Sequence, residues 1–169
     1  DSSFDAWIKY YRQDENSPNA IVSYYAKGAL IALALDLQLR AGSNGQTSLD
    51  DVMRLLWQRH GQTGVGVSED GVFAAVADVG AAVGDKALGT RLSRWLRKAV
   101  AHTDDLPLAR LLKSFAVEYR AAPAAKGATL GVKLAAGGVE AKIANVFEGS
   151  PAQAAGLSAG DVLIAIDGL

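Results

Sequence analysis

Cysteine is absent from this chain of 169 residues, and histidine occurs only twice. Without cysteine there can be no disulfide, no thiolate metal site and no cysteine nucleophile. His60 and His102 lie far apart, and no paired acid–histidine helix motif accompanies them, so we expect this chain to hold no zinc of its own. The compartment stays open between cytoplasm and periplasm, because exported proteins can also lack cysteine.

An excess of charge of either sign is also absent. The chain has 17 Lys and Arg residues against 18 Asp and Glu residues, a net charge of -1 and an isoelectric point near 6.1. The charges are interspersed rather than blocked, so they supply no basic field for nucleic acid or an anionic membrane. We therefore expect neither nucleic acid nor membrane among its partners.

Long apolar runs are missing as well. The most apolar stretch, Gly28–Leu39, is interrupted by Asp36 and is shorter than the roughly 20 residues that a membrane span needs. We interpret it as a buried helix. The first residues, Asp1–Trp7, show neither an initiator methionine nor a leader pattern, which is typical of an internal point of a longer protein.

Hydrophobic side chains are abundant and make up 50% of the chain, enough for a core and for one or two domains. Ser17-Pro18 predicts the start of a helix, after which apolar residues recur at steps of three and four. These residues are Ile21, Tyr24, Tyr25, Gly28, Ile31, Ala32, Leu35 and Leu39. We expect little of this helix to meet water.

Four further helices are predicted. Ser48 opens one with Asp51 at the capping-box position, Ser68–Asp70 opens the next, Asp85 or Thr90 opens another, and a short one runs from Pro107 to Ser114. The side chains expected to point inward are Val52, Leu55, Leu56, Phe73, Val76, Val79, Leu92, Trp95, Leu96 and Val100. The glycine-rich run Gly61–Gly66 has neither phosphate-loop nor dinucleotide spacing, so we interpret it as a connector.

The period changes after Phe115. Val117 and Tyr119 alternate with charged residues as in a strand, and Ala121–Gly127 is typical of a linker. Further strands are predicted at Val132–Ala135, Val139–Val146 and Val162–Ile166, the first two joined at Gly137-Gly138. The fold class predicted is α+β, with an all-helical bundle over residues 1–114 and a β domain over residues 115–169.

The stretch Glu148–Gly168 resembles the middle of a PDZ domain. Ser150 can cap a helix whose first residue is Pro151, Gly156 can end it in the left-handed conformation, and Gly160-Asp161 turns into an apolar strand. PDZ domains bind the C-termini of partner chains by strand addition, with backbone amides holding the terminal carboxylate. The resemblance places the matching loop at Thr129, Leu130, Gly131 and Val132.

The resemblance covers only part of a PDZ domain, because the second helix and the closing strand are missing after Gly168. We therefore expect this chain to bind C-terminal peptides measurably only when it is extended past Leu169. We also expect an open sheet edge, with exposed apolar residues around Val162, Ile164 and Ile166, that could pair two copies of the chain into a homodimer.

Motifs in the first part of the chain resemble the glycyl aminopeptidase family of zinc peptidases, which end in a PDZ domain. They are Ser3–Trp7, Asp14–Ala20, the Tyr-Tyr-x-Lys-Gly helix start and Leu35–Arg40. The resemblance implies that residues 1–114 are the helical C-terminal subdomain of a thermolysin-like catalytic domain. It also implies that the zinc ligands, an HExxH helix and a downstream glutamate, lie upstream of Asp1, so we expect this fragment alone to be inert.

One active-site residue is carried over by the same resemblance. In this family and the related aminopeptidase N group, a tyrosine directly before x-Lys-Gly donates to the oxyanion of the tetrahedral intermediate, and here that residue is Tyr25. Tyr24 is the alternative if the register is off by one, and pure packing is the alternative for both. Lys27 is interpreted as a supporting charge, and Gly28 as a site of close helix packing.

The function implied is that of the C-terminal part of a bacterial zinc aminopeptidase that removes N-terminal glycine or small residues. Zinc is then the cofactor of the longer protein, and its partners are peptide or protein substrates and a C-terminal peptide at the PDZ domain. The alternative is a non-enzymatic adaptor, a helical bundle fused to a PDZ domain. The Tyr24-Tyr25 helix start distinguishes the two, since it has no task in an adaptor.

Overall fold

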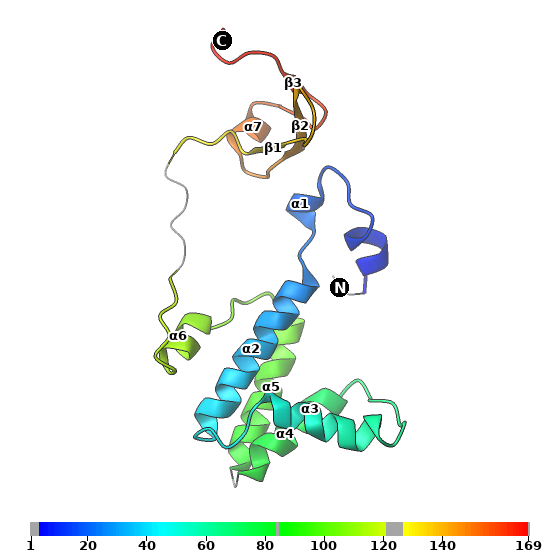
Figure 1. Ribbon diagram of the computed structural model, residues 1–169, viewed down its shortest axis with the longest axis vertical. Helices are drawn as coiled ribbons and strands as arrows, with labels where there is room; N and C mark the ends of the chain where they lie inside the picture. The colour runs from blue at the N-terminus through cyan, green and yellow to red at the C-terminus, as the bar shows by residue number, and fades with distance from the viewer. Residues whose placement is uncertain (1–3, 84, 121–126, 169) are drawn as a thin grey trace. The chain divides into compact units, whose positions relative to one another are not determined.

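The computed structural model describes residues 4–83, 85–120 and 127–168. The chain divides into two compact units, one formed by Tyr25–Ala121 and the other by Asp1–Tyr24 together with Ala122–Leu169. We call them the helical unit and the mixed unit and describe each by itself. Figure 1 labels the elements of both.

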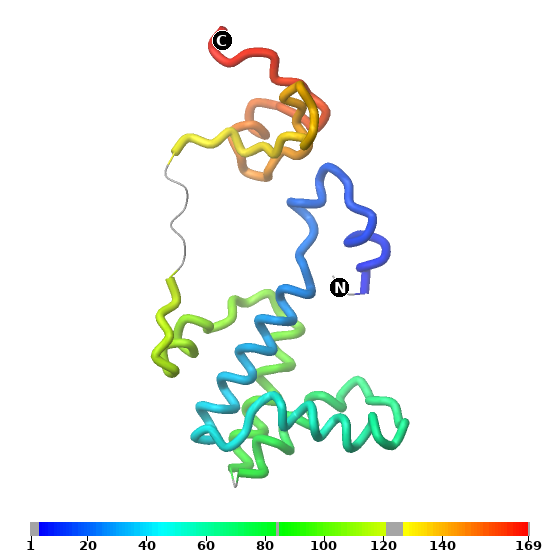
Figure 2. The backbone as a smooth tube through the Cα atoms, in the orientation of Figure 1, coloured from blue at the N-terminus to red at the C-terminus, as the bar shows by residue number. Residues whose placement is uncertain are grey.

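The helical unit is built from five α-helices and one π-helical turn in the part of the chain described. They are α2 (Tyr24–Gly42, whose first residue belongs to the mixed unit), α3 (Leu49–Leu56), η2 (Trp57–Gly61), α4 (Gly71–Ala82), α5 (Lys86–Ala101) and α6 (Leu108–Lys113). All the helices predicted after Ser48 are present, and Asp85 rather than Thr90 caps α5 by accepting from the Ala87 and Leu88 amides. The chain path is followed most easily in Figure 2.

A single core joins α2, α3, α4 and α5. Each of these helices contributes at least one fully buried side chain, among them Leu39, Val52, Val76, Leu88 and Leu92. A smaller cluster of Ala34, Leu37 and Leu111 holds α6 against α2. Burial of such side chains contributes about 1.5–3 kcal/mol each, which makes this core the main source of stability in the unit.

Helices α4 and α5 approach each other closely at two glycines. A Cβ atom built on Gly89 would lie 2.0 Å from the carbonyl oxygen of Ala77, and one built on Gly80 would lie 2.6 Å from the Gly89 Cα. No real Cβ occupies such positions, so the spacing between the two helices requires glycine at both sites. The sequence pattern did not indicate this role.

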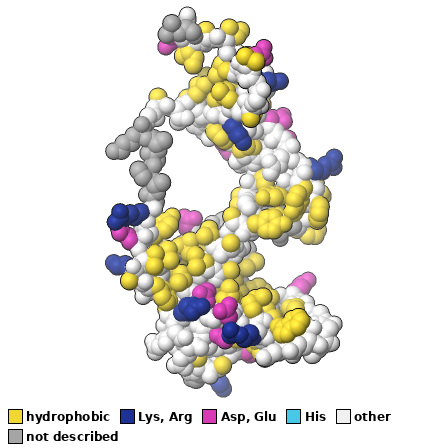
Figure 3. Space-filling model, viewed as in Figure 1, with side chains coloured by type: hydrophobic (Ala, Val, Ile, Leu, Met, Phe, Trp, Pro, Cys, Tyr) yellow, Lys and Arg dark blue, Asp and Glu magenta, His cyan; other side chains and the backbone are white. Residues whose placement is uncertain are grey.

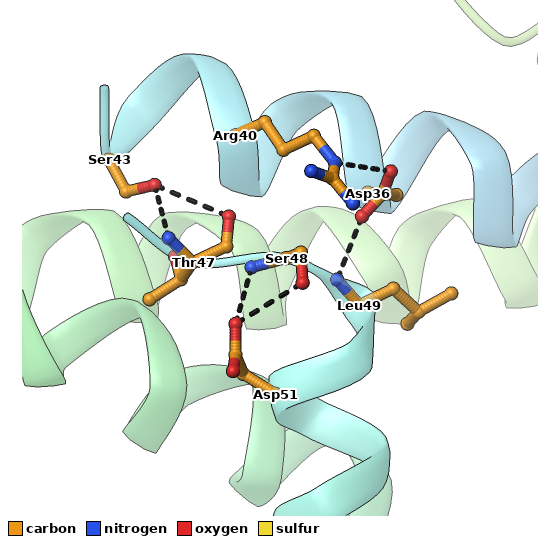
Figure 4. A network of polar contacts seen from close by, with 7 residues as sticks. All are labelled: Asp36, Arg40, Ser43, Thr47, Ser48, Leu49 and Asp51. Atoms are coloured by element: carbon orange, nitrogen blue, oxygen red, sulfur yellow. Dashed lines mark hydrogen bonds and ion pairs between the residues drawn. The ribbon is translucent and has the colours of Figure 1, made fainter. Parts of the chain in front are cut away.

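A polar network joins the end of α2 to the start of α3, as Figure 4 shows. Asp36 receives two bonds at 2.8 Å, one from the Arg40 guanidinium and one from the Leu49 amide. Ser43 accepts from the Thr47 amide at 2.9 Å. The turn between the two helices is thereby held by side chains from both.

The predicted cap of α3 forms the rest of this network. The Asp51 carboxylate accepts from the Ser48 amide at 2.8 Å and from the Ser48 hydroxyl at 3.2 Å, and Arg54 pairs with it at 2.7 Å. These contacts, with the Ser48 amide bond first, lower the pKa of Asp51.

We expect the Asp51 cap to stabilise the chain at neutral pH and to lose its effect in acid. Because the folded-state pKa lies below the unfolded one, the contribution is complete above about pH 4 and declines as the pH falls through the folded value. Asp51→Asn should therefore cost about 1 kcal/mol at pH 7 and less at pH 3 in urea unfolding. The exposed neighbour Asp50, changed to Asn, is the control; an equal cost for both variants would contradict this role.

The first predicted helix is interrupted. Helix α1 covers only Ser17–Ala20, Ile21 is extended with φ −111° and ψ 125°, and α2 begins at Tyr24. Ile21 and Val22 are β-branched and Ser23 competes for backbone bonds, so this junction disfavours helix. The first turns of α2 are also largely exposed, contrary to the prediction of a helix buried throughout, because the core of the unit begins only at Ile31.

Among the described residues, the stretch Ser17–Gly42, counted across the break at Ile21, is long and apolar enough to cross a membrane by length and composition. The prediction that this region is too short was made for Gly28–Leu39 alone and did not consider the longer stretch. Ile31, Leu35 and Leu39 lie in the core of the helical unit, and core helices pass the same test, so the finding is weak evidence for a span.

The mixed unit combines short helices with a small sheet. Its elements are η1 (Ala6–Tyr10), α1, β1 (Val132–Leu134), β2 (Ala141–Val146), α7 (Pro151–Ala154) and β3 (Val162–Leu163). The sheet is antiparallel in the order β1-β2-β3, with Val132 opposite Val146 and Ala141 opposite Leu163. Gly137, at φ +81°, makes the predicted turn between β1 and β2.

Asn19 connects the N-terminal segment to the sheet within this unit. Its amide nitrogen donates to the Val146 carbonyl at 2.9 Å, and its amide oxygen accepts from the Glu148 amide at 3.0 Å. Asn145 adds a bond to the Glu15 carbonyl at 3.0 Å. One side chain thus satisfies two backbone groups beyond the end of β2.

Two details of the prediction are wrong, one in each predicted domain. Residues 117–120 form no strand, because Ala116, at φ +58°, turns the chain out of α6 and Val117 meets no partner strand among the described residues. Val100, expected inside, is exposed near the end of α5. The linker Ala121–Gly127 lies, except for Gly127, outside the described residues, and the boundary after residue 114 stays a prediction.

Candidate functional site

The two candidate tyrosines occupy the first two positions of α2. The ring of Tyr24 meets the ring of Tyr10 edge to face, with centroids 5.4 Å apart. Tyr25 is the next residue, about 100° further round the helix, and its side chain is 58% exposed. The structure therefore gives Tyr24 a packing role and leaves Tyr25 accessible.

Tyr24 belongs to an aromatic cluster that sequence reasoning missed. Trp7 stacks on Tyr11 at 5.0 Å and Tyr10 meets Tyr11 edge to face at 5.3 Å. The spacing of Trp7, Tyr10 and Tyr11, at steps of three and four, was the signal that could have revealed it. Much of the segment that contains Trp7, Tyr10 and Tyr11 is exposed, and Figure 3 shows hydrophobic side chains gathered over it.

Lys27 ties the start of α2 to the end of α5. Its ammonium donates to the backbone carbonyl of His102, the residue that caps α5, where a cation also suits the negative end of the helix dipole. Lys27 follows Tyr25 by two positions, about 200° around the helix, so the two side chains leave α2 on nearly opposite sides. Lys27 therefore contacts the end of α5 from one side of α2, and Tyr25 lies on the nearly opposite, exposed side of the helix.

The surroundings of this contact are polar and partly paired. Asp104 forms an ion pair with Lys98 at 2.8 Å, which lowers the pKa of Asp104, with smaller contributions from His102 and Lys27.

Gly28 has no described atom within 4 Å of a built Cβ. The interpretation of Gly28 as a site of close helix packing is therefore wrong within the described part of the chain.

The predicted carboxylate loop is held against the start of α7. Gly131 has φ +75°, and a Cβ there would lie 2.2 Å from the Ser150 Cβ, so only glycine fits. The Gly131 carbonyl accepts from the Phe147 amide and the Leu130 carbonyl from the Ala152 amide, both at 2.9 Å. The Gly131 amide donates to the Thr129 hydroxyl at 3.2 Å.

The devices predicted around this loop are present. Ser150 caps α7 by accepting from the Gln153 amide, and Gly156 and Gly160 have φ of +80° and +96°. The hydrogen bond to the Leu130 carbonyl joins the loop to α7, so the loop lies next to the N-terminal cap of this helix. Ile164 and Ile166 are strongly exposed beyond β3, as predicted, and Val162 is partly so.

Strand β1 follows the predicted carboxylate loop and is at the edge of the sheet. It pairs with β2 on one side and with no other described strand. Leu134 and Leu130 are partly exposed near this edge. An unpaired edge next to a loop of this kind is the arrangement by which an extended peptide adds a strand.

Metal ligands are not gathered in the described part of the chain, where no group of three His, Cys, Asp or Glu side chains could hold an ion. His60 contacts the Val65 carbonyl through Nδ1 at 3.2 Å. His102 lies at the cap of α5 in a different part of the unit.

Comparison with known sequences gives two matches. Residues 1–31 match the M61 glycyl aminopeptidase family, and residues 121–169 match the PDZ domain. No curated protein matches the chain.

A solved structure matches nearly the whole chain. It is the crystal structure of an aminopeptidase N family protein from Idiomarina loihiensis, 39% identical, with a TM-score of 0.80. The match covers 99% of this chain and 30% of that protein, so the chain spans less than a third of its length. The α+β fold class and the resemblance to a glycyl aminopeptidase with a PDZ domain are confirmed, and the chain is peptidase-related with a peptide- or protein-binding module.

Proposed function

We propose that this chain, which resembles the C-terminal part of the glycyl aminopeptidases, contributes an oxyanion donor and a peptide-binding module to a zinc aminopeptidase. The complete enzyme would remove N-terminal glycine or other small residues from peptides. The observation that carries the proposal is the peptidase match over residues 1–31, which contains the whole Tyr-Tyr-x-Lys-Gly motif. The outward-facing Tyr25 at the start of α2 supports it.

The chemical role of Tyr25 would be to stabilise negative charge. When water attacks the carbonyl of a peptide bond, the carbonyl oxygen becomes an oxyanion, and a phenolic O–H directed at it donates more strongly than to the neutral carbonyl. Tyr25 also lies in the first turn of α2, where the helix dipole is positive and favours an anion. Both effects act mainly in the transition state, so they would raise kcat rather than substrate affinity.

The position of Tyr25 would depend on Lys27. The bond from Lys27 to the His102 carbonyl fixes the side of α2 opposite to Tyr25, next to a part of the helix that is otherwise largely exposed. A donor that contributes through fixed geometry needs such support, because reorientation in the transition state would cost part of the gain.

Zinc, when bound, would polarise the scissile carbonyl and acidify its water. The described residues of this chain offer no ligand set for it, so in the proposed enzyme the metal would be held by residues outside this chain. The steps derived from this chain are therefore limited to oxyanion donation and peptide binding.

The proposal is tested by assaying the complete protein and the 169-residue chain on Gly-, Ala- and Leu-p-nitroanilide. We expect the complete protein to be active, with Gly and Ala favoured, and to lose activity on chelation and regain it with zinc. The 169-residue chain should show no activity and no stoichiometric zinc by elemental analysis. A complete protein that is inactive on all three substrates would favour the adaptor function. Stoichiometric zinc in the 169-residue chain alone would make His60 and His102 candidate zinc ligands.

We expect measurable binding of C-terminal peptides only when the chain is extended by about 45 residues, the balance of a small domain. The loop before β1 would hold the terminal carboxylate and the edge of β1 would pair with the peptide, while specificity requires side-chain pockets on both sides of the bound strand. A peptide library titrated against the two versions checks this. Equal affinity in both would contradict it.

The same pair of chains tests the open edge. Ile164 is 94% exposed beyond β3, and an exposed sheet edge pairs readily with a second copy. We expect the 169-residue chain to dimerise at high concentration and the extended chain to remain monomeric, measured by light scattering. A 169-residue chain that stays monomeric would contradict dimerisation through the exposed sheet edge. The peptidase proposal would not be affected by that result.

A further inference from the structure

A hollow of about 420 Å³ lies where α2, α5 and α6 meet in the helical unit. Its polar lining consists of Gln38 from α2, Arg91 from α5, and Arg110 and Ser114 from α6 and its end. Leu92 and Leu111, both buried, form its apolar floor. The volume is in the range that small-molecule sites occupy in proteins.

The hollow is positively charged. Arg91 and Arg110 both line it, no acidic side chain does, and neither guanidinium has an ion-pair partner among the described residues. Elsewhere on α5, Arg97 pairs with Asp70 at 2.6 Å and Lys98 with Asp104 at 2.8 Å, while Lys86 and Arg94 have no ion pair among the described residues. Arg91 and Arg110 thus share a hollow that no acidic side chain lines.

Compensation of the α2 dipole does not account for both charges. The C-terminal end of α2 carries about half a negative charge. Its Leu39 and Arg40 carbonyls already accept from the Ser43 and Gly45 amides at 3.0 and 2.8 Å. Arg110 also lies in the last turn of α6, whose end carries a similar half charge, so the two guanidinium groups exceed the charge of both helix ends by about one positive charge.

We propose that this hollow binds a small phosphate monoester. Guanidinium groups present planar forks that match phosphate oxygens with two parallel hydrogen bonds, and two of them match the dianion better than a singly charged carboxylate. The Ser114 hydroxyl, now in a long 3.3 Å bond to the Arg110 carbonyl, is a third donor on the rim. Leu92 and Leu111 would contact the organic part of the ester.

Phenyl phosphate, inorganic phosphate and benzoate are the probes, titrated against the ¹⁵N-labelled 169-residue chain at pH 7.5 and low salt. We expect phenyl phosphate to bind at least tenfold more tightly than either of the others, since only it offers both the dianion and an apolar group. Amide shifts should be confined to the ends of α2 and α6 and to the turn of α5 around Arg91. Equal binding of inorganic phosphate would overturn the assignment of an organic ester.

Variants decide whether the two arginines form the site. Arg91→Gln and Arg110→Gln should each weaken phenyl phosphate at least tenfold, and the double variant should abolish binding. Arg94→Gln is the matched control, because Arg94 is also an exposed arginine of α5 but lines a different groove with Thr90 and Ser93. Binding retained by the double variant, or an equal loss in Arg94→Gln, would overturn the site.

Two further readouts separate binding from folding and from general charge. Circular dichroism should show unchanged helix content in all these variants, since the arginines are exposed. Arg91→Lys keeps the charge and removes the fork, so we expect it to lose several-fold in affinity. Full affinity in Arg91→Lys would overturn the bidentate geometry.

Discussion

Tyr25→Phe in the complete protein is expected to lower kcat about 100-fold or more while changing KM little. Removing one oxyanion donor has an effect of this size, because the lost hydrogen bond is strong only in the transition state. The substitution removes a single oxygen from a side chain that is 58% exposed, so the fold should not change. Steady-state kinetics on Gly-p-nitroanilide measures the effect, and circular dichroism checks the fold.

Tyr24→Phe is the matched control. Tyr24 contacts the ring of Tyr10, and phenylalanine preserves that contact, so we expect nearly unchanged turnover. If Tyr24→Phe lost activity and Tyr25→Phe did not, the register of the motif would be off by one. Unchanged turnover in both variants would remove the oxyanion role from this helix altogether.

Gly89→Ala is expected to destabilise the helical unit by about 3 kcal/mol or more, at or beyond the upper end of ordinary overpacking. The new methyl carbon would lie 2.0 Å from the Ala77 carbonyl oxygen and 3.0 Å from the Ala81 nitrogen, both backbone atoms that no side-chain rotation can move. Helices α4 and α5 would have to separate and so open the core around Val76 and Leu88. Urea unfolding followed at 222 nm measures the loss, since this unit contains most of the helix.

Gly28→Ala is the same substitution in open surroundings. Gly28 lies inside α2 with no described atom within 4 Å of the added carbon, so alanine should stabilise the chain by up to about 1 kcal/mol. The two variants are therefore expected to differ in sign. An unfolding midpoint for Gly89→Ala equal to that of the unsubstituted chain would contradict the close contact of α4 and α5.

The features predicted correctly from the sequence are those that a few neighbouring residues determine. Ser48 and Asp51 form the start of α3, Asp85 caps α5, and Ser150 caps α7, because a side-chain oxygen satisfies nearby amides whatever the rest of the chain does. Gly137 makes its turn for an equally local reason, since the turn needs positive φ.

The wrong predictions are those that inferred a strand or a continuous helix from the local pattern of apolar residues alone. Val117 and Tyr119 alternate like strand residues, yet a strand forms only against a partner, and none of the described strands lies beside them. The helix predicted from Ser17 stops at Ala20, because steps of three and four in apolar residues cannot show a short break at Ile21. The periodicity of apolar residues indicates which face of a helix is apolar, but it does not show whether the helix is continuous.

The sequence by itself therefore determined most of the helix caps and turns, and the family resemblance that singles out Tyr25. Only the tertiary structure decided which glycines bring helices together, that Lys27 holds α2 to the end of α5, and that Arg91 and Arg110 share one hollow. The physical reason is distance along the chain. Caps and turns join residues within about four positions, whereas these contacts join residues brought together by burial of a common core.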